Sequence, residues 1–193
     1  AGSPLKRMML MSLIPTPTSI EAAPAESRPL LEAVNKQIGR VPNLFRLVGV
    51  SPASLEAYLG MNGALGKGTL DVRTRERIAL AVAEINGCGY CLSAHSYFGK
   101  NLAKLSDDEI LANRDGGSTD VKADAAVRFA AQLANARGQV GDDAVQAVRQ
   151  AGYTDAQIIE IIAHVAINTF TNYVNESLKT EIDFPVVSRR AAA

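Results

Sequence analysis

The stretch from Arg75 to Lys100 constrains the fold most, because it carries both cysteines of the chain and one of its two histidines. Cys88, Cys91 and His95 are spaced i, i+3 and i+7, which places them on one face of an α-helix. Asn86-Gly87, just before them, is typical of a helix end, since glycine adopts the left-handed conformation easily. We therefore predict one helix ending at this dipeptide and a second beginning near Cys88.

The rest of the chain is also patterned as helices, and we find no convincing strand. Two segments have the spacing of a capping box, Ser106 with Glu109 and Thr154 with Gln157, and Asp71 is placed to cap another helix. We expect further helices over residues 26–38, 42–48, 52–65, 72–86, 106–114, 124–136, 142–150 and 154–179. The sequence thus predicts an all-α, multi-helix bundle over residues 26–184, preceded by an extended arm (1–25) and followed by a tail (185–193).

The composition limits the classes of binding partner and the cellular compartment that we expect for this chain. Lys plus Arg and Asp plus Glu both number 20, so nothing favours a nucleic acid or an anionic membrane. Lys6-Arg7 and the apolar residues after them imitate a signal peptide, but the run is short and stops at Pro15, so we interpret it as a tag remnant plus native start. No stretch is apolar enough to span a membrane. Two cysteines do not make a secreted disulfide framework, and we expect a cytoplasmic protein.

The cysteine stretch has the groups needed for thiol chemistry. A helix start favours a thiolate at Cys88, and His95, one turn after Cys91, can accept a thiol proton. Glu76 and Glu84 are candidate acids for proton transfer. Glu76 precedes the helix break, so helical periodicity does not place it, and only tertiary packing can bring it to the thiols.

Three other interpretations compete with a redox-active dithiol. A zinc site needs a fourth ligand, for which His164 is the only other strong candidate. A purely structural disulfide across so short a loop restrains the unfolded chain little. Two buried, inert cysteines are common in proteins generally. We favour the redox-active dithiol, with no metal and no cofactor, and interpret His164 as a core or interface histidine with its polar groups satisfied.

The pattern Glu76-x11-Cys88-x2-Cys91-x3-His95 resembles the alkylhydroperoxidase D-like branch of the carboxymuconolactone decarboxylase superfamily. The flanking segments I-P-T-P-T, G-R-V-P-N-L-F-R and S-P-A-S-L-E-A-Y-L resemble its peroxidase-related subgroup, so the similarity runs from about Leu13 to Phe184. The chain departs from well-known members at Tyr90, where they have a histidine before the second cysteine. That departure bears on the rate or pH dependence of the proton relay.

The resemblance implies a thiol peroxidase. Cys91 would attack the hydroperoxide and become a sulfenic acid, and Cys88 would condense with it to a disulfide. His95 and Glu76 would relay protons, with Glu84 as an alternative. An external dithiol protein, dihydrolipoyl or thioredoxin-like, would reduce the disulfide, and the family habit of assembling implies a homo-oligomer.

Two points remain open at this stage. The helix-start argument lowers the pKa of Cys88 more than that of Cys91, whereas the resemblance assigns the attack to Cys91, and we follow the resemblance. The function also has two alternatives. One is a carboxymuconolactone decarboxylase-like lyase, which uses no dithiol, and the other is a non-enzymatic redox-sensing oligomer.

A weak internal repeat pairs Glu160-x11-Asn172-x2-Asn175 with Glu76-x11-Cys88-x2-Cys91. It indicates either a duplicated helical unit or a coincidence between two amphipathic helices. Asn168, Asn172 and Asn175 are costly to bury unpaired, so we expect partners for them across a helix–helix or subunit interface. We place the oligomer contact around these three residues. Tyr90 is our better candidate among the nearby aromatic residues for contact with solvent or substrate.

Overall fold

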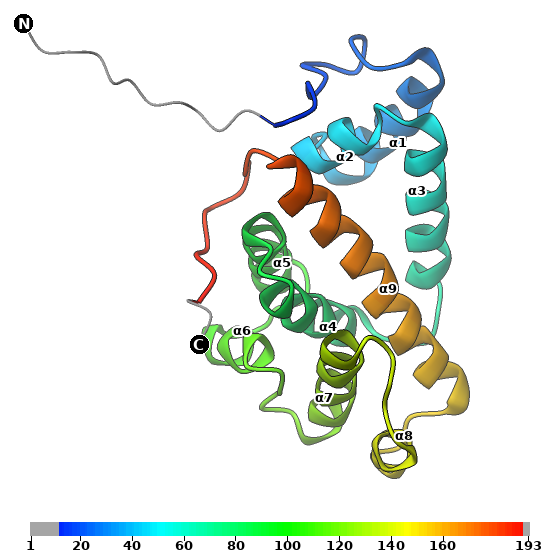
Figure 1. Cartoon of the computed structure of the whole chain (residues 1–193), viewed down its shortest axis with the longest axis vertical. Coiled ribbons are helices and arrows are strands. Elements are labelled where there is room, and N and C mark those ends of the chain that lie inside the picture. Colours follow the sequence, from blue (N-terminus) through cyan, green and yellow to red (C-terminus); the bar gives the residue numbers. More distant parts are fainter. Residues whose placement is uncertain (1–11, 191–193) are drawn as a thin grey trace, which may run out of the picture.

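The computed structural model describes residues 12–190, and this part of the chain contains nine α-helices, one short 3-10 helix and no strand (Figure 1). The all-α prediction is therefore confirmed. The elements are the 3-10 helix Ala25–Ser27, α1 Arg28–Ile38, α2 Asn43–Val48, α3 Pro52–Gly66, α4 Val72–Ile85, α5 Gly89–Asn101, α6 Asp107–Arg114, α7 Val121–Ala136, α8 Asp142–Gln150 and α9 Asp155–Leu178.

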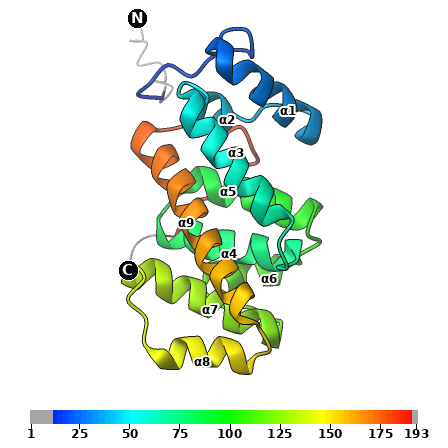
Figure 2. The same cartoon turned by 90° about the vertical axis from the view of Figure 1, so that its right-hand side faces the viewer.

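Helix α4 is the centre of the molecule. It packs against α5, α6, α7 and α9, and its Ile78, Leu80 and Val82 are completely buried. Figure 2 shows α1–α3 at one end, α7 and α8 at the other, and the long α9 running past α4 from one end toward the other. Burying apolar side chains on several faces of one helix excludes much apolar surface from water, which is the main favourable term in folding. This packing fixes α4 as the platform from which its side chains reach the candidate site.

The predicted break between α4 and α5 is confirmed. Asn86 is the C-cap of α4, and Gly87 follows with φ of 66°. A Cβ on Gly87 would be strained in this left-handed conformation and would also lie 3.2 Å from the Arg189 guanidinium. The break lets α5 begin at Gly89 with Cys88 as its N-cap.

Two of the predicted helix starts, those after Asp71 and Thr154, agree with the structure. Asp71 accepts a hydrogen bond from the Thr74 N–H, and the capping box of Thr154 is complete. The box predicted at Ser106 is wrong, because only its serine half forms and the Glu109 carboxylate turns into the interior instead. Helix α7 begins three residues before the predicted Asp124, since Asp120 is its cap.

Glu109 is the acceptor of a buried polar cluster and is 3% exposed. Its carboxylate accepts hydrogen bonds from Arg77 Nε (2.6 Å), Asn113 Nδ2 (2.9 Å) and the Thr119 N–H (2.8 Å), and from the hydroxyls of Ser118 and Thr119. Burial by itself raises the pKa of a carboxyl, but the Ser118, Thr119 and Asn113 donors outweigh it and lower the pKa of Glu109 to about 2. The cluster fastens α4 to α6 and to the loop before α7.

We expect Glu109→Gln to destabilise the chain by about 3 kcal/mol, because it leaves the buried Arg77 cation without its carboxylate. The same cluster makes wild-type stability depend on pH. The folded pKa of Glu109 lies below its ordinary value of 4.5, so this stabilisation is present above that pH and is lost as the pH falls toward 2. Urea unfolding at neutral pH, with the exposed Asp108→Asn as control, measures the first effect. Equal unfolding midpoints for the two variants would contradict it.

The two ends of the described chain pack on the bundle. Ser12 Oγ donates to the Leu178 carbonyl (2.9 Å) at the end of α9. Near the other end, the Val187 N–H donates to Ser93 Oγ (2.9 Å) on α5. Most of the signal-like start, including Lys6-Arg7, lies outside the described residues. In the described part of the chain, no helix is both long enough and apolar enough to cross a bilayer.

Candidate functional site

The two cysteines lie at the start of α5, inside the core. Both are free thiols, with Cys88 completely buried and Cys91 2% exposed. Cys88 Sγ caps the helix by accepting the Cys91 N–H at 3.2 Å. Cys91 itself lies in the first helical turn, so both sulfurs are next to the positive end of the helix dipole.

Two asparagines of α9 complete the surroundings of the thiols, and sequence reasoning did not assign them to the site. Asn175 donates its side-chain amide to Cys91 Sγ at 3.2 Å. Asn172, one turn earlier, accepts from Asn86 Nδ2 at 2.8 Å and also lowers the pKa of Cys91. The signal that could have found them is the repeat spacing, which aligns Asn172 with Cys88 and Asn175 with Cys91.

The asparagines do not form an oligomer contact. Asn172 is completely buried, Asn175 is 2% exposed and Asn168 is 7% exposed, all within one chain. Asn168 donates to the His164 carbonyl of its own helix (2.8 Å). Of the two expected settings, a helix–helix or a subunit interface, the structure has the first for Asn172 and Asn175, whose partners are Asn86 at the end of α4 and Cys91 on α5.

Glu76 and His95 form a polar pair, which the packing of α4 against α5 brings together. His95 Nδ1 lies 2.8 Å from Glu76 Oε2, joining α5 to α4. The side chains are 23% and 15% exposed, respectively, so the pair is partly open to water while the thiols are not. Burial favours the neutral imidazole, but the Glu76 carboxylate outweighs it and raises the pKa of His95.

The surroundings distinguish the two thiols in the order opposite to the helix-start expectation. Burial raises the pKa of Cys91, but the Cys88 hydrogen bond, the His95 charge and the amides of Asn175 and Asn172 outweigh it and lower the pKa to about 7. Hydrogen bonding to Cys91, followed by burial, raises the pKa of Cys88. The expectation that Cys88 has the lower pKa of the two thiols is therefore wrong, because the hydrogen bond between the sulfurs raises the pKa of Cys88 and lowers that of Cys91.

A cavity of about 830 Å³ opens beside the His95–Glu76 pair. Its wall is built from α1, α3, α4 and α9, and mixes apolar side chains such as Leu59 and Ile167 with polar ones. Tyr58 is in this wall, and burial, followed by the charges of Cys91 and Glu76, raises the pKa of its hydroxyl. The cavity is thus lined by His95 and Glu76, whereas neither cysteine is among its lining residues.

His164 belongs to the same cavity wall. It is 5% exposed, and burial and then the Arg75 charge lower its pKa to about 4, so it is neutral at pH 7. Its Nε2 has no hydrogen-bond partner in the described chain, so the expectation of a fully satisfied histidine is wrong. Among residues 12–190, no three His, Cys, Asp or Glu side chains are grouped so as to hold a metal ion.

Two residues singled out from the sequence lie elsewhere. Glu84 is paired with Arg114 and accepts the Arg190 N–H (2.8 Å), so both of its carboxylate oxygens are occupied away from the cavity. Tyr90 is 4% exposed, donates to Asp183 Oδ1 (2.8 Å) and accepts the Leu44 N–H (3.1 Å). The expectation that Tyr90 contacts solvent or substrate is wrong, because its hydroxyl links α2, α5 and the C-terminal segment.

We expect Asn175→Leu to slow alkylation of Cys91 near pH 6 by roughly tenfold. The substitution removes one amide donor from the thiolate, and a hydrogen bond to a charged group is worth about 1.5–3 kcal/mol. Iodoacetamide kinetics against pH measure the change. Asn168→Ala on the same helix is the control, since its amide contacts a backbone carbonyl and not the sulfur. Matching profiles for Asn175→Leu and wild type would rule out a role for this amide.

Known proteins share parts of this chain and its fold. Residues 52–136, which include both cysteines, His95 and Glu76, match the sequence model described as "Carboxymuconolactone decarboxylase family". A segment of 46 residues is 48% identical to an uncharacterized protein of Haemophilus influenzae. It covers 23% of this chain, and this chain spans only 41% of that relative.

Solved structures cover nearly the whole chain. A peroxidase-related protein with an alkylhydroperoxidase AhpD core, from Ralstonia eutropha, is 26% identical over 90% of this chain and 93% of its own, with a TM-score of 0.79. The debrominase Bmp8, solved in complex with 2,3,4-tribromopyrrole, shares the fold at 19% identity over 92% of both chains, with a TM-score of 0.72. Fold and family together support a peroxidase-related or decarboxylase-like enzyme. Residues 52–136 therefore resemble the carboxymuconolactone decarboxylase family in sequence, and the chain as a whole has the fold of proteins with an alkylhydroperoxidase AhpD core.

Proposed function

We propose that the chain is a thiol-dependent peroxidase that reduces hydroperoxides through a Cys88/Cys91 dithiol–disulfide cycle. The observation that carries the proposal is the polarisation of the two sulfurs. Cys91 receives hydrogen bonds from Asn175 and Cys88, and its pKa is lowered to about 7, whereas the pKa of Cys88 is raised. One sulfur is therefore prepared as the nucleophile and the other as a neutral thiol that resolves it.

The first step is attack of the Cys91 thiolate on the terminal oxygen of a hydroperoxide. The O–O bond breaks, the sulfur is oxidised to a sulfenic acid, and the alkoxide leaving group takes a proton to become an alcohol. His95 is placed to supply that proton, because Glu76 at 2.8 Å raises its pKa and so favours the charged imidazolium. We assign Glu76 as the residue that orients and charges His95.

The second step forms the disulfide. The Cys88 sulfur attacks the sulfenic sulfur of Cys91, the S–O bond breaks, and hydroxide leaves with the Cys88 proton as water. An external dithiol protein, dihydrolipoyl or thioredoxin-like, then reduces the disulfide and is itself oxidised to a disulfide. The proposal also includes a homo-oligomer. Its contact is open to test, and α9 offers the exposed apolar residues Ile159, Phe170 and Tyr173.

Both thiols are buried, so a hydroperoxide needs a route to them. Burial alone does not distinguish a reactive cysteine from an inert one, because inert cysteines are also buried. A merely apolar environment would raise the pKa of Cys91, whereas its polar neighbours lower it. The cavity is lined by Glu76, His95 and Tyr58, and His95 lies one helical turn beyond Cys91. We propose this cavity as the substrate entrance.

Steady-state consumption of hydrogen peroxide and of an alkyl hydroperoxide, with dihydrolipoyl and thioredoxin-like reductants supplied in turn, tests the proposal. We expect turnover with at least one reductant, and peptide mapping after one equivalent of peroxide should find Cys88 and Cys91 joined within one chain. Two free thiols after oxidation, or only bridges between chains, would sink the mechanism. A disulfide that changes assembly without turnover would instead favour a redox-sensing oligomer, and turnover of a lactone-type acid would favour a lyase.

A further inference from the structure

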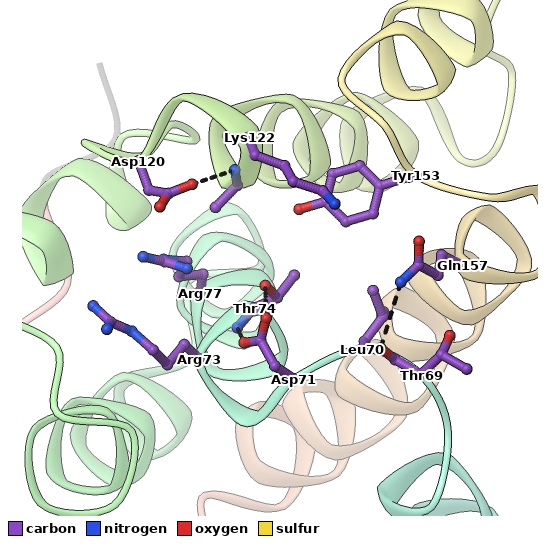
Figure 3. A pocket seen from close by; sticks show the side chains of 11 residues that line it. Thr69, Leu70, Asp71, Arg73, Thr74, Arg77, Asp120, Lys122, Tyr153 and Gln157 are labelled. Atoms are coloured by element: carbon purple, nitrogen blue, oxygen red, sulfur yellow. Dashed lines mark hydrogen bonds between the residues drawn. The ribbon is translucent and has the colours of Figure 1, made fainter.

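A second pocket lies apart from the thiols, where the starts of α4, α7 and α9 converge (Figure 3). It holds about 260 Å³, and none of its lining residues lines the larger cavity. Arg73, Thr74 and Arg77 come from α4, Lys122 comes from α7, and Tyr153 precedes α9. Three segments far apart in the sequence thus supply three cations to one small pocket, which is also lined by the hydroxyl-bearing residues Thr69, Thr74 and Tyr153.

The buried guanidinium of Arg77 is the feature of this pocket that indicates a ligand. The side chain is 6% exposed, and its Nε–H donates to Glu109, which fixes the position of the guanidinium. An arginine fork normally binds a carboxylate or phosphate with two parallel hydrogen bonds. Arg77 lines the pocket, and only its Nε–H is engaged by Glu109.

Arg73 and Lys122, the other two cationic residues, line the same pocket. Arg73 and Arg77 leave α4 on the same side (Figure 3), and both Arg73 and Lys122 are exposed. Lys122 Nζ lies 4.9 Å above the Tyr153 ring, which holds the ammonium over the pocket and leaves its hydrogens free for an acceptor. The Tyr153 side chain points into the space between α4 and α7 in Figure 3.

Two acids also line the pocket, but each is engaged at a helix start. Asp71 accepts from the Thr74 N–H (2.8 Å) and the Thr74 hydroxyl (3.2 Å). Asp120 accepts from the Ala123 N–H (2.8 Å). The caps neutralise part of the two helix dipoles, and the arginines and the lysine supply the free donors.

We infer that this pocket binds a small oxyanion, a phosphate or carboxylate group, between the Arg77 fork and the side chains of Arg73 and Lys122. The guanidinium fork matches the two oxygens of either group, and the ammonium adds a mobile point charge. The volume admits a small anion and not a large ligand. The inference is independent of the thiol chemistry, because the pocket shares no residue with the larger cavity.

Titration calorimetry of the full chain with inorganic phosphate and with succinate, at constant ionic strength set by chloride, tests this site. We expect saturable binding with a Kd of ~1 mM or tighter for at least one of them. The double variant Arg73→Gln with Lys122→Gln should weaken it at least tenfold. Arg77→Lys keeps a charge beside Glu109 but removes the fork, and should weaken it similarly. Lys36→Gln, an exposed charge on α1, should leave it unchanged.

The anion that binds identifies the kind of ligand that the pocket takes. Binding of phosphate alone supports a phosphorylated ligand, binding of succinate alone supports a carboxylate, and binding of both supports a general oxyanion site. The inference is overturned if neither anion gives saturable heat, or if Lys36→Gln weakens binding as much as the double variant does. If Arg77→Lys does not fold, the double variant decides alone, since its two residues are exposed.

Discussion

Cys91→Ser is expected to abolish hydroperoxide turnover, with a loss of at least about 10⁴, the scale on which enzymes lose activity when their nucleophile is removed. A serine hydroxyl in the same place would not ionise near neutral pH, so the amides of Asn172 and Asn175 would have no anion to stabilise. The fold should persist, because the change nearly conserves volume at a position already surrounded by polar groups. Steady-state peroxide consumption with an excess of reductant measures the loss.

Cys88→Ser is the matched variant, since it alters the other thiol of the same helix turn. The variant should still carry out the first step, so that one equivalent of hydroperoxide is consumed and Cys91 is trapped as a sulfenic acid. A dimedone adduct seen on Cys91 by intact mass identifies that state. The Cys88 change should also slow the first step, since it removes a hydrogen bond that lowers the pKa of Cys91. If Cys88→Ser were the inactive variant and Cys91→Ser gave the single turnover, the roles of the two sulfurs would be reversed.

The helices could be predicted from the sequence because their ends carry local signals. Asp71 and Thr154 cap α4 and α9, two of the three helices that hold the site, and Gly87 separates α4 from α5, so each signal acts only on neighbouring residues. Glu109 shows where local reasoning stops. Its capping-box spacing is real, but a buried arginine from another helix is a stronger partner for its carboxylate than a backbone N–H at the surface.

The part of the candidate site that lies on one helix could also be predicted from local sequence signals, whereas the part that depends on packing between helices could not. Cys88, Cys91 and His95 share one helix, so their spacing carries their geometry, whereas the choice between Glu76 and Glu84 depends on how α4 packs on α5. Eight residues on a helix leave two side chains about 80° apart, so both glutamates could not face His95. Packing turns Glu76 toward His95 and Glu84 toward Arg114.

The partners of the asparagines of α9 could not be identified from the sequence, because the polarity of a side chain does not specify which group it contacts. Their burial cost predicts that Asn172 and Asn175 have polar neighbours, but an interface between subunits and one within a chain satisfy that cost equally well. The repeat spacing contained the missing information, since it aligns both residues with the cysteines. A cysteine thiolate is the buried anion that their amides contact or stabilise.

His95→Gln is expected to slow peroxide reduction by about a hundred- to ten-thousandfold, the usual worth of a general acid–base group. Two effects combine in it. The imidazolium lowers the pKa of Cys91, and it supplies the proton to the leaving alkoxide. Without it the thiol pKa should rise from about 7 toward the free value of about 8.5, so that the thiolate fraction at pH 7 falls from about one half to about 3%.

The direction in which the pKa of Cys91 moves can be measured from the pH dependence of its alkylation. Iodoacetamide alkylation of the wild type should rise through its midpoint near pH 7, and that of His95→Gln should rise at higher pH, with equal rates where both thiols are fully ionised. Glu76→Gln should move the midpoint in the same direction but less far, because it lowers the basicity of His95 without removing the ring. Glu56→Gln, on α3 in the same cavity wall, is the control for a generic loss of charge.

The double variant of Glu76 and His95 separates a relay from two independent contributions. If Glu76 acts through His95, adding Glu76→Gln to His95→Gln should change the alkylation profile little further, so the two effects are not additive. Fully additive shifts would mean that the carboxylate acts on the thiol directly. Zinc content is assayed on the same samples: coincident profiles for wild type and His95→Gln would remove His95 as the activating base, and stoichiometric zinc lost on substitution would replace the relay with a metal site.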